Sequence, residues 1–513
     1  FLDAPSVQDG SAQLQLARYS ADFLGAQFEN GEEGSIHNYE LIYYPTTTTA
    51  GPEGLKRPNP DSVNGVPIRD LGNDKEAYRY YFQLRNNEDR DNYRGVIGMG
   101  RLFSRGNNEM LAAAPAVLDI DQWLRSYAAV ALGAVSDSYF NNTNAHNTRF
   151  YHRPSDGRML LFPWDMDFAF ITGATSSMTP NSDLTRLISD PVNRRLYWGH
   201  VLDLLDRSYN SSYMRRWVEH YEELLTGQDL TPLTSFIQQR SSFARGQVRN
   251  AVPGVSFAIT TNGGDDFDAG ETPVVLEGTG WVDVREIRLA GSETSLPLTW
   301  TDADSWRVAI PLGPGANAIR IEALDFAGDI TAVDTVTITN TSEVVAASAG
   351  NFIVSELMYH PAGPSAGEQA AGFTDENQFE YLEFRNIGEL TIDAGGVSFA
   401  AGIEFVFPPG THLAPGERIV VASDLDAFAA RHGAGGLKLT GGYGGSGTSL
   451  RNSGERLRIL AADGSSLADF SYHDQAPWPA SADGGGYSLV PIAPGHPSFD
   501  PADPGHWRSS LAP

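Results

Sequence analysis

The stretch from Leu160 to Phe170 (LLFPWDMDFAF) constrains the fold of this chain more than any other, because a short apolar run there leads directly into two carboxylates. Residues 160–162 predict a buried strand, and Pro163 ends its hydrogen-bonding ladder. Asp165 and Asp167 follow at alternate positions, so on extended backbone their side chains point the same way. Two such acids need a hard cation or neighbouring donors, since like charges otherwise raise each other's pKa.

A second polar cluster, Asp137–Asn147, precedes this stretch and leads into the apolar segment 148–151. The turn Arg153–Gly157 contains Asp-Gly, which is a strong hairpin signal. We therefore expect residues 149–152 to pair with residues 159–162. In that hairpin, Asn147 and Asp165 lie at the outer edges, on the same side.

The order of these motifs, an Asp, a His-Asn pair, a strand–turn–strand and Pro-Trp-Asp-x-Asp, resembles the spore-coat-type protein kinases of the CotH family. The resemblance implies an α+β kinase-like domain at residues 1–252 that binds Mg²⁺ with ATP. It makes Asp137 the catalytic base that receives a substrate hydroxyl proton. It makes Asn147, Asp165 and Asp167 the metal ligands, with Asn147 also contributing to cofactor binding.

The family also has a further N-terminal portion that contributes a small lobe and a nucleotide-gripping Lys, and we expect this chain to start inside or after that portion. Within this sequence only Lys56 and Lys75 precede the acidic cluster. Lys56 ends a loop rich in Gly and Thr that lacks the spacing of a P-loop, and it is our candidate for cofactor binding. Lys75 is predicted to be a surface charge at a helix start, so nucleotide binding rests on Lys56, on Lys75 or on an Arg, or it is lost.

The residues alone leave other interpretations open. Asp-x-Asp beside a hairpin also suits a solvated turn or a structural Ca²⁺ site. His146 and His152 could supply a metal site, although a lone His beside a hairpin is more often structural. Paired acids also allow a hydrolase acting on an extracellular polymer. Finally, the kinase-like domain could be inert, in a surface protein used for structure, adhesion or assembly.

The composition of the chain limits the classes of partner that it can bind. The 513 residues include 36 basic and 64 acidic side chains, a net charge of −28. This charge argues against nucleic acid and anionic membranes as partners. There is no Cys, which excludes disulfides and thiolate metal sites, and no apolar run long enough to span a membrane. The chain starts at Phe1 without a leader, so we expect that a secretion signal was removed or lies outside this sequence, and that the protein acts on an extracellular or cell-surface protein.

Helical periodicity dominates residues 1–252. Helices are predicted at residues 14–24, 76–85, 89–97, 119–133, 197–205, 213–224 and 231–247, with a strand at 36–44.

After Pro253 the pattern changes to short alternating strands between turns, which predicts an all-β sandwich at residues 253–340. The strands are expected at residues 255–260, 273–276, 282–289, 306–312 and 318–323. The module resembles the immunoglobulin-like domains of bacterial surface proteins. Its acidic loop, residues 263–271, suits solvent better than Ca²⁺, because the ligand spacing fits no EF-hand. Residues 341–350 are predicted to be a linker.

Residues 351–492 form a second predicted β domain. Its motifs are Ser355–Pro361, Glu380–Asn386, Leu413–Gly416, Leu450–Glu455 and Trp478–Leu489. Together they resemble the lamin-tail domain, an immunoglobulin-like sandwich that in bacteria usually accompanies secreted or surface enzymes. The fold class is therefore multidomain: an α+β kinase-like domain followed by two all-β immunoglobulin-like sandwiches. We expect residues 493–513 to be an extended Pro-rich tail held by Trp507. Exposed sandwich edges would allow self-assembly.

Overall fold

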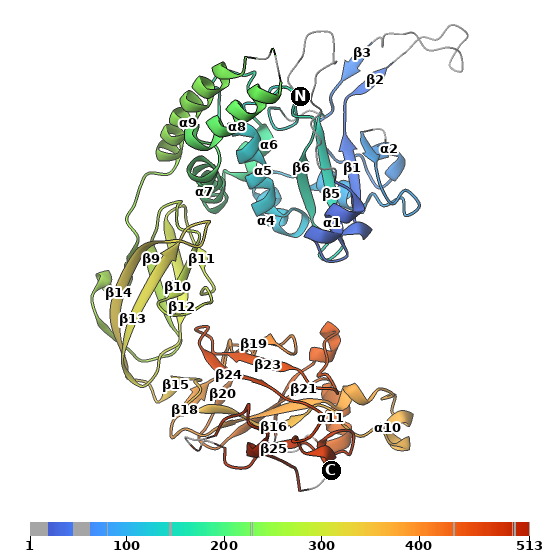
Figure 1. The fold of residues 1–513 in the computed structure, drawn as a ribbon, viewed down its shortest axis with the longest axis vertical. Coiled ribbons are helices and arrows are strands. Elements are labelled where there is room, and N and C mark those ends of the chain that lie inside the picture. Colours follow the sequence, from blue (N-terminus) through green and yellow to red (C-terminus); the bar gives the residue numbers. More distant parts are fainter. Residues whose placement is uncertain are drawn as a thin grey trace. The chain divides into compact units, whose positions relative to one another are not determined.

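A computed structural model describes residues 19–44, 62–79, 81–142, 146–225, 227, 229–433, 437–494, 496 and 499–511. The chain divides into two compact units. Unit 1 consists of residues 1–256 with the short segments 280–285 and 300–305, and unit 2 contains the remainder. The fold is multidomain, with helices and strands in the N-terminal part and β-sheets after it (Figure 1).

An antiparallel sheet in the order β4-β1-β5-β6 is the centre of unit 1. Its strands are β1 (Ser35–Tyr39), β4 (Phe82–Leu84), β5 (Thr148–His152) and β6 (Met159–Pro163). The predicted hairpin is confirmed, since Thr148 pairs with Pro163 and His152 with Met159. The sequence did not reveal that β1 lies on the other side of β5, with Tyr39 opposite Thr148.

Both faces of this sheet are covered, which explains why all five residues of β1 are buried. Phe150 and Leu161 join the large core of the helices. Tyr151 and Leu160 point to the other face, where they pack with Leu24 of α1 (Ala21–Gln27). Because successive side chains of a strand point to opposite faces, the apolar side chains of this one hairpin contribute to two separate cores.

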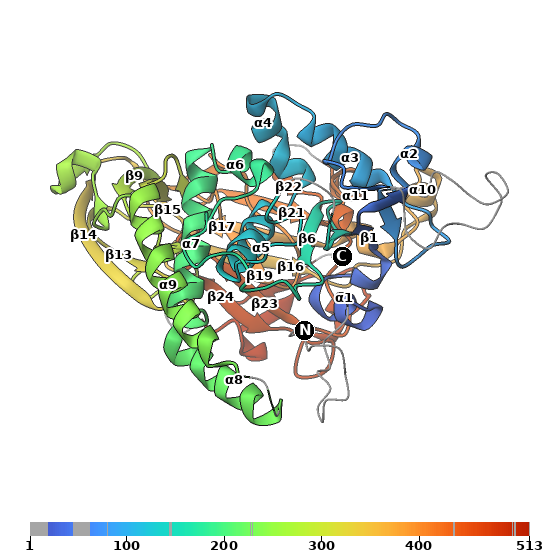
Figure 2. The ribbon, with the colours of Figure 1, turned by 90° about the horizontal axis from the view of Figure 1, so that it is seen from above.

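Four of the helices predicted for unit 1 are confirmed. α5 (Ile120–Leu132), α7 (Pro191–Arg207), α8 (Ser211–Leu224) and α9 (Thr231–Ala251) match the prediction, and α5 packs beside both α7 and β6 (Figure 2). The helix predicted at residues 89–97 begins later, as α3 (Arg94–Phe103). The structure also contains α4 (Asn107–Val117) and α6 (Ser182–Leu187), which were not predicted.

Two predictions near the N-terminus are wrong. The helix expected at residues 76–85 ends early, as α2 (Lys75–Arg79), because the next residues form β4 and pair with β1. The strand expected at residues 36–44 breaks into β1 and β2 (Ile42–Tyr44), and β2 pairs instead with β3 (Ser62–Asn64). Most of the helix expected at residues 14–24 lies outside the described residues.

A buried arginine of α7, Arg195, joins the two short segments of unit 1 to the helices. Its guanidinium donates to four backbone oxygens and stacks on the Trp300 ring, 3.2 Å from the ring centroid. The acceptors are the carbonyls of Gly280 at 2.8 Å, Ala303 at 3.1 Å, Val284 at 2.6 Å and Trp281. Burial lowers the pKa of Arg195 to about 9. The charge of the Arg195 guanidinium is thus stabilised by the dipoles of backbone carbonyls and not by hydrogen bonds to an acidic side chain.

The β-sandwich module of unit 2 consists of two four-stranded sheets, in the orders β10-β13-β14-β8 and β11-β12-β9-β7. The strands are β7 (Ala258–Ile259), β8 (Phe267–Ala269), β9 (Val274–Thr279), β10 (Glu286–Leu289), β11 (Thr299–Trp300), β12 (Ser305–Ile310), β13 (Gly315–Leu324) and β14 (Ile330–Asn340). β9 and β12 bury every second residue, as the alternation predicted. The long β14, which pairs with β13 over ten residues, was missed.

The C-terminal domain contains a six-stranded sheet, β22-β21-β17-β16-β25-β26, and two three-stranded sheets, β15-β18-β20 and β19-β23-β24. Its strands are β15 (Val344–Ala346), β16 (Phe352–Met358), β17 (Tyr381–Asn386), β18 (Thr391–Asp393), β19 (Ser398–Ala401), β20 (His412–Leu413), β21 (Arg418–Ala422), β22 (Lys438–Gly441), β23 (Arg456–Leu460), β24 (Ser466–Ser471), β25 (Leu489–Pro491) and β26 (Trp507–Ser509). Two short helices, α10 (Ala366–Ala370) and α11 (Leu425–His432), accompany them.

Two boundaries differ from the prediction. The linker expected at residues 341–350 contains β15, whose Val345 is buried in the core of this domain and whose backbone pairs with β18. The tail expected to be extended contains β26, and Trp507 is buried as predicted. A short apolar strand is hard to recognise among Ser, Ala and Thr residues, because its partner lies about 45 residues away.

A buried acid, Glu380, makes the stability of unit 2 depend on pH. The Leu450 N–H donates to Glu380 Oε2 at 2.8 Å, Oε1 has no hydrogen-bond partner among the described residues, and burial raises the pKa of Glu380 from 4.5 to about 8. The folded protein therefore holds this proton more tightly than the unfolded chain. The resulting stabilisation is complete below about pH 4.5 and is lost as pH rises through 8.

Replacing Glu380 with Gln is expected to raise the stability of unit 2 at pH 8 by roughly 3 kcal/mol, because the amide imitates the protonated acid. Calorimetric unfolding at pH 5 and pH 8 measures this, and the gain should be small at pH 5. The control is Glu389→Gln, at an exposed position. An equal gain at both pH values, or a gain in the control, would contradict the account.

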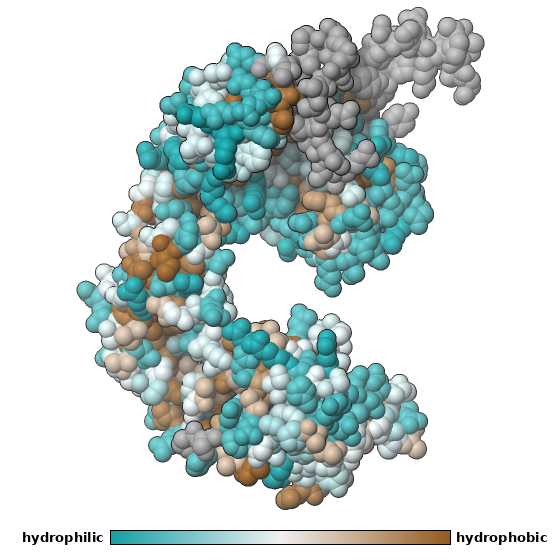
Figure 3. Space-filling model, in the orientation of Figure 1, coloured by the Kyte–Doolittle hydropathy of each residue, from teal (hydrophilic) through white to brown (hydrophobic). Residues whose placement is uncertain are grey.

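None of the described helices is long and apolar enough to cross a membrane. Hydrophilic side chains cover most of the surface visible in Figure 3, in keeping with the net charge of −28.

Candidate functional site

The two acidic segments predicted from the sequence are joined by backbone hydrogen bonds. The Ser136 N–H donates to the Phe168 carbonyl at 3.2 Å, and the Phe170 N–H donates to the Gly133 carbonyl at 2.7 Å. Asp137 follows Ser136 and Asp167 precedes Phe168, so each acid lies one residue from the same hydrogen bond. Chain segments 30 residues apart in sequence thus present their carboxylates in one region.

The Asp137 carboxylate is held from one side and open on the other. His146 Nε2 lies 3.0 Å from Asp137 Oδ2, and Asn147 Nδ2 donates to the Asp137 carbonyl at 2.8 Å. The same Asn147 nitrogen is 3.5 Å from Asp137 Oδ2. The Asp137 side chain remains 43% exposed, whereas Asn147 is buried. The carboxylate is therefore fixed in direction yet reachable from solvent.

Asn147 and Asp165 both adopt left-handed backbone, with φ of 45° and 53°. Asn and Asp are the non-Gly residue types that accept this conformation most readily. This conformation turns the chain sharply just before β5, at Asn147, and just after β6, at Asp165. Asp165 and Asp167 are both exposed.

Glu40 also lies at these acidic segments, although no sequence motif points to it. It follows β1, and its Oε2 lies 3.8 Å from His146 Nδ1. Burial raises the pKa of Glu40, the nearby Asp165 charge adds to the rise, and His146, the Asn147 N–H and Arg149 oppose it. His146 thus lies between two carboxylates, Glu40 and Asp137. Only the register of β1 against β5 could have revealed this, and no local motif encodes it.

An arginine of β5, Arg149, lies close enough to Glu40 for its charge to lower the pKa of that acid. Arg149 donates through Nε to Asn38 Oδ1 at 2.8 Å, and its guanidinium lies 3.3 Å from the Trp164 ring centroid. The stack on Trp164 fixes the guanidinium beside the Asp165 turn.

Of the two lysines that precede the acidic cluster in sequence, only Lys75 lies in the part of the chain that the structure describes. Lys75 begins α2 and forms an ion pair with Asp91, as its prediction as a surface charge requires. Lys56, predicted to bind the cofactor, lies outside the described residues. His152, on β5, lies 3.2 Å from the Asn92 amide, which indicates a structural role.

A network of buried hydrogen bonds holds the loop that contains Asp137, which we call the Asp137 loop. The Tyr139 hydroxyl donates to Asp183 Oδ2 at 3.0 Å, and Asn181 Nδ2 donates to the carbonyl oxygens of Tyr139 and Asn142. Burial raises the pKa of Asp183 to about 6. Asn181 also caps α6, so the loop is anchored to a helix start.

A second buried arginine, Arg240 of α9, holds the segment that follows the Asp165 turn. It donates to the carbonyl oxygens of Ala131 at 2.6 Å, Ala174 at 3.2 Å and Ser176. These bonds tie the end of α5 to residues 174–176. In sequence, Ala131 precedes the Asp137–Asn147 cluster, and residues 174–176 follow the Leu160–Phe170 stretch.

We expect Arg240→Met to loosen the Asp165 turn, because three carbonyls lose a charged donor. Hydrogen exchange at the Phe170 and Thr172 amides, which bond to Gly133 and Ala134, should rise at least about tenfold. Arg249→Met, at an exposed position on the same helix, is the control. Unchanged exchange at both amides in Arg240→Met would show that the hydrogen bonds of Arg240 do not stabilise the turn.

The donor chemistry of the site suits a hard divalent cation. Asn147 uses its amide nitrogen on Asp137, which leaves its carbonyl oxygen as the ligand atom, and Asp165 and Asp167 add exposed carboxylates. Mg²⁺ prefers oxygen ligands, takes few from the protein and keeps waters or phosphate oxygens for the rest. Among the described residues, no three His, Asp or Glu side chains are grouped so as to hold a metal by themselves.

Comparison with known proteins agrees with this architecture. Residues 25–240 match the family model for CotH kinase protein, and residues 345–474 match the model for the Lamin Tail Domain. The search of curated proteins found no match. One similar solved structure is that of the Bacteroides ovatus mixed-linkage glucan utilization locus SGBP-B in complex with a mixed-linkage heptasaccharide. The identity is 11% and the TM-score 0.12, over 40% of this chain and 42% of that one, so the match spans less than half of either.

Proposed function

We propose that the CotH kinase domain of this chain, residues 25–240, transfers the γ-phosphate of ATP to a hydroxyl group of a protein. The observation that supports the proposal is the Ser136–Phe168 hydrogen bond, which joins the residue before Asp137 to the residue after Asp167. Phosphoryl transfer needs mainly positioning and neutralisation of charge, and this site offers both.

Asp137 acts as the base. Its exposed carboxylate accepts the proton of the substrate hydroxyl while the hydroxyl oxygen bonds to the γ-phosphorus. The bond from that phosphorus to the bridging oxygen breaks, and ADP leaves with the electron pair. Asn147 and His146 hold the direction of Asp137 through the contacts of 2.8 Å and 3.0 Å.

Asn147, Asp165 and Asp167 would hold Mg²⁺, which supplies neutralisation of phosphate charge when bound. Glu40 is near enough to feel the Asp165 charge, and it keeps His146 between two acids. Arg149 would give the phosphates a cation, a role for which Lys75 is poorly suited because of its ion pair with Asp91.

We further propose that the protein works outside the cell or on its surface, with a protein as its substrate. The acidic surface and the accompanying lamin tail domain support this setting. The alternative is a surface structural or adhesion protein whose kinase-like domain is inert. The engagement of Lys75 with Asp91 favours that alternative, since it removes one conventional nucleotide ligand.

The test is transfer of phosphate from γ-labelled ATP with Mg²⁺, to the chain itself and to a generic acceptor protein. Wild type should incorporate label, and Asp165→Asn should not. Asn is chosen because it accepts the left-handed backbone of residue 165, so loss of label reports the lost charge and not misfolding. Absence of label with wild type, or equal label with both proteins, would favour the inert alternative.

A further inference from the structure

The lamin tail domain contains a cavity of about 630 Å³, separate from the acidic site of unit 1. Its volume falls in the range of small-molecule pockets, about 300–1,000 Å³. Three stretches of the chain line it: Ser453; Ser471 and residues 473–478; and Ala502 with Pro504. No part of the proposed phosphate transfer uses these residues.

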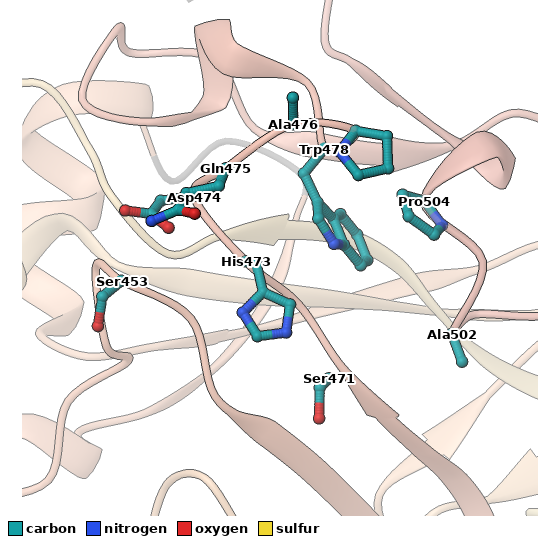
Figure 4. Close-up of a pocket in the computed structure, with 10 residues that line it drawn as sticks. Ser453, Ser471, His473, Asp474, Gln475, Ala476, Trp478, Ala502 and Pro504 are labelled. Carbon is teal, nitrogen blue, oxygen red and sulfur yellow. The ribbon is translucent and has the colours of Figure 1, made fainter.

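The cavity has one polar side and one apolar side. Figure 4 shows Ser453, Asp474 and Gln475 on one side and Trp478 and Pro504 on the other, with His473 between them. A ligand held there therefore meets hydrogen-bonding groups along one edge and a flat apolar surface along the other.

Several polar groups of the lining form no hydrogen bond with the residues that the structure describes. Among the described residues, none hydrogen-bonds to the side chain of His473 or Gln475, or to the indole N–H of Trp478. A largely buried Trp normally gives its N–H a partner, and Trp478 is only 6% exposed. In Figure 4 the indole nitrogen lies on the ring edge nearer His473. These donors and acceptors are thus available to a ligand.

The apolar wall is held in place by the aromatic core. The Trp478 and Trp507 ring centroids are 6.2 Å apart, and Trp507 stacks on Phe470 at 5.7 Å. The Trp507 indole donates to the Pro501 carbonyl at 2.9 Å, which fixes the tail segment that carries Ala502 and Pro504. A wall already fixed in this way loses little freedom when a ligand binds.

We propose that this cavity binds a neutral saccharide. The lining contains no Lys or Arg and one acid, Asp474, so it does not attract anions such as phosphate. A sugar ring presents an apolar C–H face and a rim of hydroxyls, and the two sides of the cavity match these two surfaces. Hydroxyls both donate and accept, so they can bond to the Gln475 amide, the His473 imidazole, the Asp474 carboxylate and the Trp478 indole N–H. The proposal is independent of the kinase proposal.

The test is calorimetric titration of the full chain with cellobiose, maltose, xylobiose and N,N′-diacetylchitobiose, with inorganic phosphate as the anionic probe. At least one saccharide should bind and phosphate should not. Gln475→Ala should weaken that binding about tenfold, the effect of losing one hydrogen bond to the ligand. Gln475 is exposed and its side chain bonds to none of the described residues, so the fold should persist.

The matched control is Gln369→Ala, on α10 and outside the cavity, which should bind as wild type does. No saccharide binding by the wild type, tighter binding of phosphate, or equal affinity in Gln475→Ala and wild type would each overturn the proposal.

Discussion

Replacing Asp137 with Asn is expected to lower the rate of phosphate transfer by roughly 10²–10⁴-fold, the usual contribution of a general base. Asn is the same size and keeps an oxygen near His146, which lies 3.0 Å from the carboxylate, so the loop should retain its shape. It cannot take up the hydroxyl proton. Because Asp137 is not one of the proposed metal ligands, the affinity for Mg²⁺–ATP should stay close to that of wild type.

This separation of rate from affinity distinguishes a base from a residue that binds the nucleotide. Single-turnover transfer and nucleotide affinity are measured on the same preparations, and Asp89→Asn, at an exposed position, is the control. If Asp137→Asn transferred phosphate at the wild-type rate, Asp137 would not be the base. If its transfer and affinity fell together, Asp137 would instead be part of the binding site.

Replacing Arg195 with Met should destabilise unit 1 by about 3 kcal/mol or more. The buried guanidinium serves four carbonyls, and a buried acceptor left without a donor costs about 1–3 kcal/mol. For a unit of this size, the Tm should fall by roughly 6–12 °C. Scanning calorimetry measures the change, and hydrogen exchange should rise in segments 280–285 and 300–305.

Two variants of the same helix calibrate this effect. Arg195→Lys keeps the charge but lacks the planar fork, so it should lie between wild type and Met. Arg207→Met removes an exposed side chain with an ion pair of 3.4 Å to Asp203, and it should change stability little. A Tm shift in Arg195→Met no larger than that in Arg207→Met would show that water can replace the guanidinium.

Local signals explain what the sequence predicted well. The β5–β6 hairpin follows from an Asp-Gly turn between two apolar runs, and α9 from the Thr231-Pro232 start. The Asp137 cluster and the Asp165 turn were singled out because polar residues next to buried strands form a compact motif. Their joining by the Ser136–Phe168 bond is consistent with the motif, but only the structure provides the geometry.

Long-range pairing explains what was missed. Glu40 enters the site because β1 lies beside β5, more than 100 residues later in the chain. In the sequence, Arg195 and Arg240 resemble ordinary surface charges, yet both are buried and donate to backbone carbonyls. Every residue has a backbone carbonyl, so the sequence does not indicate which ones will accept these bonds. The strand β15 lies in a Ser- and Ala-rich stretch and is stabilised by its pairing with β18. In each case the deciding contact joins segments that no periodicity connects.

The most direct test of the central claim is calorimetric titration of ATP into the full chain, with and without Mg²⁺, for wild type and for Asp165→Asn. The account predicts binding by wild type that requires Mg²⁺ and is lost in Asp165→Asn. Binding of equal strength in both proteins, or no binding by wild type with Mg²⁺ present, would contradict the claim that the Asp137 loop and the Asp165 turn form a nucleotide site.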